Sequence, residues 1–118
     1  MYGVPPDLPL ERVLGRECVQ IGIGRFEIRF SFLNAVEIHV EGRWEVCDES
    51  GRVIDQAREH AERECYRVHK LIGSPVRRYS IDAPTSFTLF FENGYSLTVF
   101  DDSEQYESFS IQPGDIVV

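Results

Sequence analysis

The second half of this 118-residue chain resembles the first half. Residues 13–21 align with residues 71–79 at an offset of 58. Residues 32–40 align with residues 91–99 at an offset of 59. The copies of a repeated unit bury the same face, so this feature constrains the architecture more than any other. The alternative to a duplication is a pair of ordinary β-hairpins that resemble each other.

The length of 118 residues predicts one domain over residues 1–118, because it is sufficient for a single hydrophobic core. Within this domain the repeated units are expected over residues 8–48 and 66–118. Residues 1–6 contain glycine and two prolines, and we expect them to form a flexible arm.

Alternating apolar residues in each copy predict a β-hairpin. In the second copy a three-residue loop over residues 92–94 keeps the apolar side chains on one face, with Gly94 in a left-handed conformation. The registers that follow are Phe91–Tyr95, Leu89–Leu97 and Phe87–Val99 in the second copy, and Phe32–Val36, Phe30–Ile38 and Ile28–Val40 in the first. Ala35 takes the place of Gly94 in the first copy, so we expect a strained turn there.

Between the two copies the apolar period changes from two to that of a helix. The stripe consists of Ile54, Ala57, Ala61, Cys65, Val68 and Ile72. Asp55 is suited to cap the start of a helix, and Gly73 followed by Pro75 is a stop signal. These features predict a helix over residues 55–72.

The predicted fold class is therefore α+β. Two pseudo-symmetric antiparallel β-meander units form a twisted sheet or open barrel, and the one main helix, over residues 55–72, packs on its apolar face. One helix is a small cover for two apolar hairpin faces, so we expect a homodimer to bury the remainder.

Twelve basic and twenty acidic residues give a net charge of −8. This charge repels phosphate groups, which argues against a nucleic-acid partner and against an anionic membrane surface, and it favours a basic protein partner. Three cysteines without a CxxC pair are typical of a reducing compartment, and the first residues lack a signal-peptide pattern. We therefore expect a cytoplasmic protein.

The densest acidic cluster consists of Asp101, Asp102, Glu104 and Glu107. We interpret this cluster as a docking surface for a basic protein. The alternative is a solvated connection that keeps the neighbouring apolar strand soluble.

A second interpretation places a small-ligand site or a minor enzyme's active site between the two copies. The side chains expected to line this pocket are His39, Trp44 and Tyr106. Glu45 and Glu107 each follow an aromatic residue, and paired carboxylates can perform acid–base chemistry. In a strand each of these glutamates faces away from its aromatic neighbour, which favours a surface position.

Metal binding is the less favoured interpretation of the residues between the copies. Cys65 and His69 have the i,i+4 spacing of two ligands on a helix, with His60 nearby. Further ligands are absent from this segment, and Cys65 belongs to the apolar stripe. We expect a core cysteine, surface histidines, and neither a metal nor a cofactor.

Three motifs resemble a small family of single-domain bacterial proteins of unknown function. They are Leu71-Ile72-Gly73 before a strand, the hairpin Phe91-x-Asn93-Gly94-x-x-Leu97, and Asp101-Asp102-Ser103-x-x-Tyr106-Glu107-Ser108. The resemblance implies a fold but no activity. In size, charge and class the chain also resembles immunity proteins of bacterial toxin systems. We therefore expect a non-enzymatic protein-binding module, with the ligand-binding or enzymatic pocket as the alternative.

Overall fold

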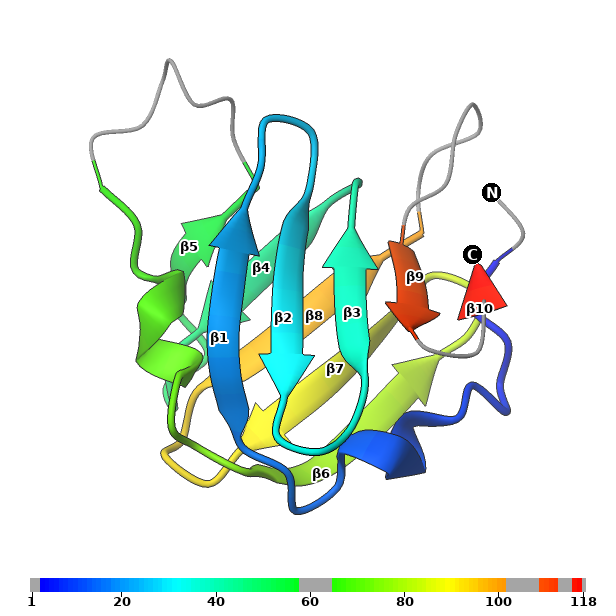
Figure 1. Ribbon diagram of the computed structural model, residues 1–118, viewed down its shortest axis with the longest axis horizontal. Coiled ribbons are helices and arrows are strands. Elements are labelled where there is room, and N and C mark those ends of the chain that lie inside the picture. The colour runs from blue at the N-terminus through cyan, green and yellow to red at the C-terminus, as the bar shows by residue number, and fades with distance from the viewer. Residues whose placement is uncertain (1–2, 58–64, 102–108, 113–115, 118) are drawn as a thin grey trace.

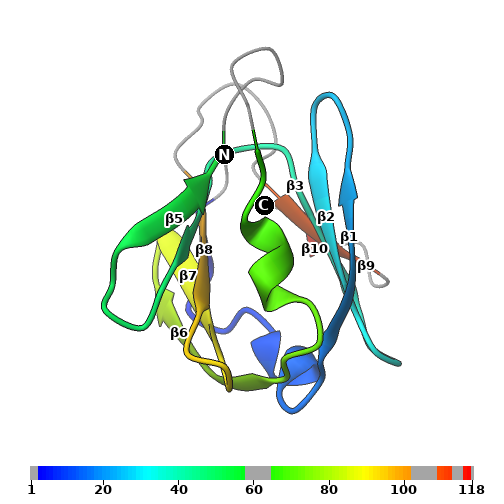
Figure 2. The same cartoon turned by 90° about the vertical axis from the view of Figure 1, so that its left-hand side faces the viewer.

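Two antiparallel five-stranded sheets pack face to face (Figures 1 and 2). The computed structural model describes residues 3–57, 65–101, 109–112 and 116–117. The first sheet contains, in spatial order, β1 (Cys18–Ile23), β2 (Ile28–Phe32), β3 (Glu37–Val40), β9 (Phe109–Gln112) and β10 (Ile116–Val117). The second contains β5 (Val53–Gln56), β4 (Trp44–Cys47), β8 (Ser96–Phe100), β7 (Ser86–Phe91) and β6 (Val76–Asp82). Two 3-10 turns precede the meanders, η1 (Leu10–Val13) and η3 (Val68–Leu71).

The two halves of the chain exchange strands between the sheets. After β3 the chain crosses to the other sheet, where β4 pairs with β8 instead of with β3. In the second half β9 crosses in the opposite direction and pairs with β3. Each sheet thus consists of a three-stranded meander from one half and a two-stranded hairpin from the other.

Backbone hydrogen bonds repeat in the segments that enter β1 and β6. The N–H of Gly15 donates to the carbonyl of Val76 at 2.8 Å, and the N–H of Gly73 donates to that of Cys18 at 2.7 Å. These four residues correspond to one another at the offset of 58. Glu17 and Pro75, which also correspond, form a bridge with each other. The two entry segments are therefore paired with approximate two-fold symmetry.

The predicted hairpin registers are confirmed. Strands β2 and β3 pair Phe30 with Ile38, and β7 and β8 pair Leu89 with Leu97. Gly94 has a φ of +94°, as the bulged loop requires. The expected strain at Ala35 is wrong, because the first loop places Asn34 in the left-handed region instead, at a φ of +51°. Asparagine tolerates this conformation better than alanine does.

The predicted α+β fold with a main helix over residues 55–72 is wrong. Among the described residues of this range, Asp55 and Gln56 belong to β5, and only η3 is helical. Asp48 explains the start of β5, because its Oδ1 accepts hydrogen bonds from the N–H groups of Ser50 and Arg52 and so closes a β4–β5 hairpin. Residues 58–64 of the predicted helix lie outside the described residues.

Asp55 caps the start of η3, which lies twelve residues later in the chain, and does not begin a helix itself. Its Oδ2 accepts hydrogen bonds from the N–H groups of Arg67 at 2.7 Å and Val68 at 2.9 Å. A strand residue thereby fixes the start of η3. The coil of η3 lies between the two sheets, at the side that β1 and β5 border (Figure 2).

The apolar hairpin faces cover each other across the sandwich. Phe32 of β2 stacks on Phe91 of β7 at a ring distance of 6.4 Å, which joins the two meanders. Val68 and Leu71 of η3 are buried in the same core. The argument for a homodimer from two uncovered hairpin faces therefore no longer applies, because the second sheet provides the cover.

The first described residues are held against the body of the protein. Val4 is buried, and its N–H donates to the carbonyl of Pro84 at 2.8 Å. The N–H of Gly3 donates to Oδ2 of Asp101 at 2.6 Å. Residues 3 and 4 thus differ from the loose arm that the sequence favours, while residues 1 and 2 lie outside the described residues.

Candidate functional site

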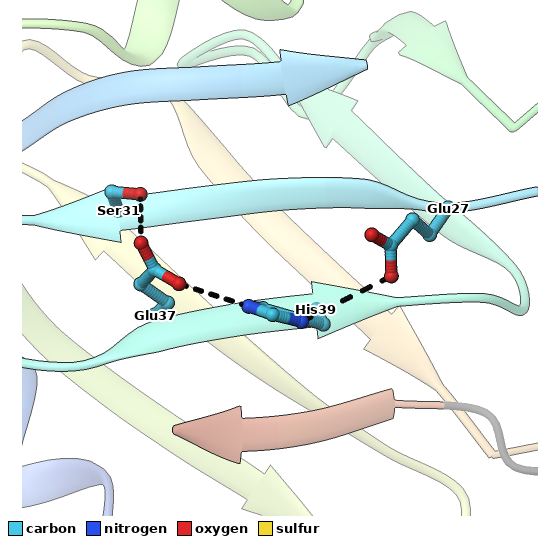
Figure 3. A network of polar contacts seen from close by, with 4 residues as sticks. All are labelled: Glu27, Ser31, Glu37 and His39. Atoms are coloured by element: carbon cyan, nitrogen blue, oxygen red, sulfur yellow. Dashed lines mark hydrogen bonds and ion pairs between the residues drawn. The ribbon is translucent and has the colours of Figure 1, made fainter. Parts of the chain in front are cut away.

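A polar network crosses the outer face of the first sheet (Figure 3). The imidazole of His39 lies between two carboxylates, with Nε2 at 3.0 Å from Oε1 of Glu37 and Nδ1 at 3.9 Å from Oε2 of Glu27. The hydroxyl of Ser31 donates to Oε2 of Glu37 at 3.1 Å. The His39 side chain is 24% exposed, and those of Glu27 and Glu37 are 39% and 44% exposed.

Strand alternation places this network. Glu37 and His39 are two residues apart on β3, so both side chains leave the face opposite to the buried Ile38. Ser31 lies directly opposite Glu37 in the β2–β3 register. Ser110 of β9 lies opposite His39 on the other side. Ser31, Glu37 and His39 are therefore held by strands inside the sheet, and Glu27 joins them from the end of the β1–β2 loop.

The network lowers the pKa of Glu37 below its ordinary value. The main cause is the hydrogen bond with His39, and the hydrogen bond from Ser31 acts in the same direction. A donor near a carboxylate stabilises its charged form. Glu37 consequently contributes stability above the ordinary glutamate pKa, and this contribution is lost as the pH falls through the lowered pKa.

Replacement of His39 is expected to return the pKa of Glu37 toward its ordinary value. We suggest His39→Thr, because Thr98 occupies the corresponding place in β8 and threonine suits a strand. Ser31→Ala is expected to raise the same pKa by less, since the Ser31 bond is the weaker cause. Carboxyl chemical shifts of Glu37 followed against pH measure both effects. An equal pKa in His39→Thr and the unmodified protein would contradict the network.

The contacts of His39 and Ser31 limit the chemistry that the network can perform. Both ring nitrogens of His39 face carboxylates of the same sheet, so neither is directed toward an open position for a substrate atom. A serine nucleophile would need its hydroxyl on the imidazole, whereas Ser31 donates to Glu37. The two carboxylates are partly exposed, and the exposed Arg29 lies directly opposite His39 in the β2–β3 register.

The structure does not bring the described members of the predicted pocket together. His39 faces outward from the first sheet, whereas Trp44 is buried in the core on β4 of the second sheet. The Trp44 ring contacts Phe30 edge-on at 6.3 Å. The third member, Tyr106, lies outside the described residues. His39 and Trp44 therefore do not line one cavity.

The predicted acidic docking cluster is only partly described. Asp101 is half-buried, and one of its carboxylate oxygens holds the N–H of Gly3. Its own N–H donates to the carbonyl of Thr85. Asp101 thus has a structural role in fixing the start of the chain. Asp102, Glu104 and Glu107 lie outside the described residues.

The cysteines and histidines considered for a metal do not converge in the described part of the chain, where no group of three or more candidate ligands is placed to hold an ion. Cys65 is exposed, and His69 belongs to η3 and not to a longer described helix. Cys18 is fully buried, and burial raises the pKa of its thiol to about 11. Burial also raises the pKa of Cys47. His60 lies outside the described residues.

The outer face of the second sheet carries two arginine–aromatic stacks that the sequence analysis missed. The guanidinium of Arg78 lies 3.7 Å from the centre of the Phe90 ring, and that of Arg43 lies 4.0 Å from the centre of Phe100. Arg43 also pairs with Glu45 at 3.3 Å, so Glu45 is a surface residue in an ion pair. The arginines cover the ring faces on which a ligand would stack. Glu107 is not among the described residues.

Comparisons with known protein families, with curated proteins and with solved structures found no match to this chain. The described residues contain no helix with the length and apolar character needed to cross a membrane.

Proposed function

We propose that the protein is a non-enzymatic binding module that engages a basic protein partner, in the manner of an immunity protein. The observation that carries this proposal is the pair of partly exposed carboxylates, Glu27 and Glu37, that flank His39 on the outer face of the first sheet. The net charge of −8 supports it, because a field of this sign attracts a basic partner and raises the rate of encounter.

The network prepares this surface for binding. Glu37 is held by Ser31 and His39 before a partner arrives, so less side-chain entropy is lost when an arginine or lysine docks. The lowered pKa of Glu37 keeps its carboxylate charged in weak acid. Asp102, Glu104 and Glu107 form a second acidic element in the sequence and extend the proposal to residues 102–107.

The test is affinity capture of basic proteins from a cell extract at low and high salt. Replacing Glu27 and Glu37 by glutamine is expected to reduce the captured partner about tenfold at low salt, because two contacts between opposite charges are lost. Glu11→Gln with Glu92→Gln is the matched control, since it removes two exposed carboxylates from other parts of the chain. Asp102→Lys with Glu104→Lys tests the second acidic element.

Two results would overturn the proposal. One is equal loss of capture in the control and in the Glu27/Glu37 variant, which would indicate only a general effect of net charge. The other is unchanged capture in every variant, which would mean that acidic groups do not hold the partner. The Glu27/Glu37 variant and the Glu11/Glu92 control leave every buried residue unchanged, so both are expected to keep the fold.

A further inference from the structure

An exposed arginine lies beside the two carboxylates on the outer face of the first sheet. Arg29 of β2 is directly opposite His39 of β3, so both side chains leave the same face. The hydrogen bond with His39 is the main cause that lowers the pKa of Glu37, and the charge of Arg29 is the smallest cause. Within the described residues, the Arg29 guanidinium forms neither a hydrogen bond nor an ion pair.

The Arg29 guanidinium lies over Gly22, its opposite neighbour on β1. A Cβ atom at Gly22 would lie 3.3 Å from both Nε and Nη2 of Arg29. Strand β2 separates β1 from β3, which carries Glu37 and His39. The carboxylate of Glu27 is directed toward His39 (Figure 3). The guanidinium therefore lies on the β1 side of β2, away from the carboxylates of its own sheet.

This contact gives a reason for a glycine inside a strand. Glycine weakens a strand interior, and Gly22 does not belong to the glycines with a positive φ, so its backbone conformation does not require glycine. A glycine in a strand is also found where another group approaches the backbone closely. Here that group is the Arg29 guanidinium, which a side chain at position 22 would displace. The two strands together thus hold this cation in place.

We propose that Arg29 binds a carboxylate of the partner, next to the basic group that Glu27 and Glu37 bind. This inference rests on the proposed function, because it adds an anion position to the cation position on the same face. A guanidinium presents its N–H donors in a fork that matches a carboxylate. These donors have no acceptor among the described residues, and their position on Gly22 reduces the entropy that binding costs.

The two positions define the chemistry of the partner's docking segment. Arg29 and His39 are cross-strand neighbours with Cβ atoms about 4.5–5.5 Å apart, and Glu37 lies one diagonal position further. A basic residue matches both positions if it has a carboxylate close to it, on its own terminus or on a neighbouring residue. A run of lysines and arginines would instead bring a second cation against Arg29, which is unfavourable. The partner is therefore expected to present mixed charges and not a purely basic segment.

Two small probes test the anion position. N-acetylarginine carries a guanidinium and a carboxylate, whereas N-acetylargininamide carries the same guanidinium and a neutral amide. Titrations at low salt, followed by the backbone amide chemical shifts of β2 and β3, are expected to show that N-acetylarginine binds about threefold more tightly, as for an exposed pair of opposite charges. The net charge of −8 acts in the opposite direction, because it attracts the more positive amide probe. A preference for N-acetylarginine therefore requires a local cation.

Three variants assign this preference to Arg29. Arg29→Gln is expected to remove the preference and to keep the binding of N-acetylargininamide, since Glu27 and Glu37 are unchanged. Gly22→Val keeps the charge of Arg29 but fills the space under the guanidinium, so it is expected to reduce the preference, and valine suits a strand. Arg77→Gln is the matched control, because it removes an exposed arginine from β6, and it is expected to keep the preference.

The outcomes distinguish this inference from the proposed function. Equal or tighter binding of N-acetylargininamide by the unmodified protein would overturn the inference, as would a preference that persists in Arg29→Gln. If N-acetylargininamide then loses its binding in the Glu27→Gln and Glu37→Gln double variant, the proposed function stands. Chemical-shift changes from neither probe would contradict both proposals, because neither charged position would be occupied.

Discussion

Phe87→Ala is expected to destabilise the protein by about 3–5 kcal/mol, the usual cost of removing a buried phenylalanine ring. Phe87 is fully buried on β7 of the second sheet. Its ring contacts that of Phe109, on β9 of the first sheet, edge-on at 5.0 Å. The deletion therefore leaves a cavity between the two sheets and removes an aromatic contact that joins them.

Urea denaturation of the two single variants and the double variant measures this contact. Phe87→Ala and Phe109→Ala are expected to be coupled by about 0.5–1.5 kcal/mol, because an aromatic pair contributes beyond the area it buries. Phe26→Ala, which removes an exposed ring, is expected to change the free energy of unfolding by less than about 0.5 kcal/mol. Strict additivity of Phe87→Ala and Phe109→Ala would mean that the rings do not touch.

Leu71→Ala is expected to cost about 2–5 kcal/mol, whereas Ile72→Ala is expected to cost about 0.5 kcal/mol or less. Leu71 is 0% exposed in η3, where it fills the space between the sheets, and the next residue, Ile72, is 46% exposed. Neighbouring residues of similar size thus differ in burial, which makes each the control for the other.

The same pair distinguishes η3 from the helix that the sequence favours. In a helix over residues 55–72, Ile72 belongs to the apolar stripe and Leu71 does not, so the order of the two effects would be reversed. Thermal or urea unfolding of both variants is sufficient to decide between η3 and a helix over residues 55–72. A larger loss of stability in Ile72→Ala than in Leu71→Ala would contradict the sandwich.

Local features of this fold are predictable from the sequence. The period-2 pattern of Phe87 to Phe91 and the Asn93-Gly94 pair specify both the hairpin and its register, because only one loop length places the apolar residues on one face. The same pattern without glycine gives the first hairpin, where Asn34 takes the left-handed position. These elements depend on neighbours in sequence, and the pattern contains the needed information.

The helix prediction failed because one spacing is compatible with two structures. Ile54, Val68 and Ile72 have helical spacing, yet Ile54 lies in strand β5, whose hairpin with β4 is closed by Asp48. Asp55 was interpreted as a helix cap and does accept backbone N–H groups, but those of Arg67 and Val68, twelve and thirteen residues later. A contact between distant residues cannot be inferred from a local window.

Most of the candidate site is predictable from the sequence. The sequence favours His39 as a site residue, but for a pocket shared with Trp44, which the structure does not form. The alternation along β3 places Glu37 and His39 on one face, and the hairpin register places Ser31 beside them. Only the approach of Glu27 requires the structure, because that residue lies at the end of the preceding loop.

The strand exchange is the feature with the largest consequences for both proposals. It places β9 against β3, so that Glu37 and His39 lie on an inner strand of the first sheet, beside Arg29 of β2. The link between β3 and β4, residues 41–43, is short enough for a hairpin, and hairpins are the commonest use of such links. A sequence-based interpretation therefore pairs β3 with β4, as the predicted meander units do.

Nuclear Overhauser contacts across the strands test this exchange most directly. The exchanged fold predicts backbone contacts between Ile38 and Ile111 and between Val46 and Leu97, which are paired in the two sheets. A hairpin of β3 with β4 predicts contacts between Val40 and Trp44 and lacks the first two. Observation of the Val40–Trp44 pairing, with no contact between Ile38 and Ile111, would contradict the exchange and remove the basis of the proposed surface.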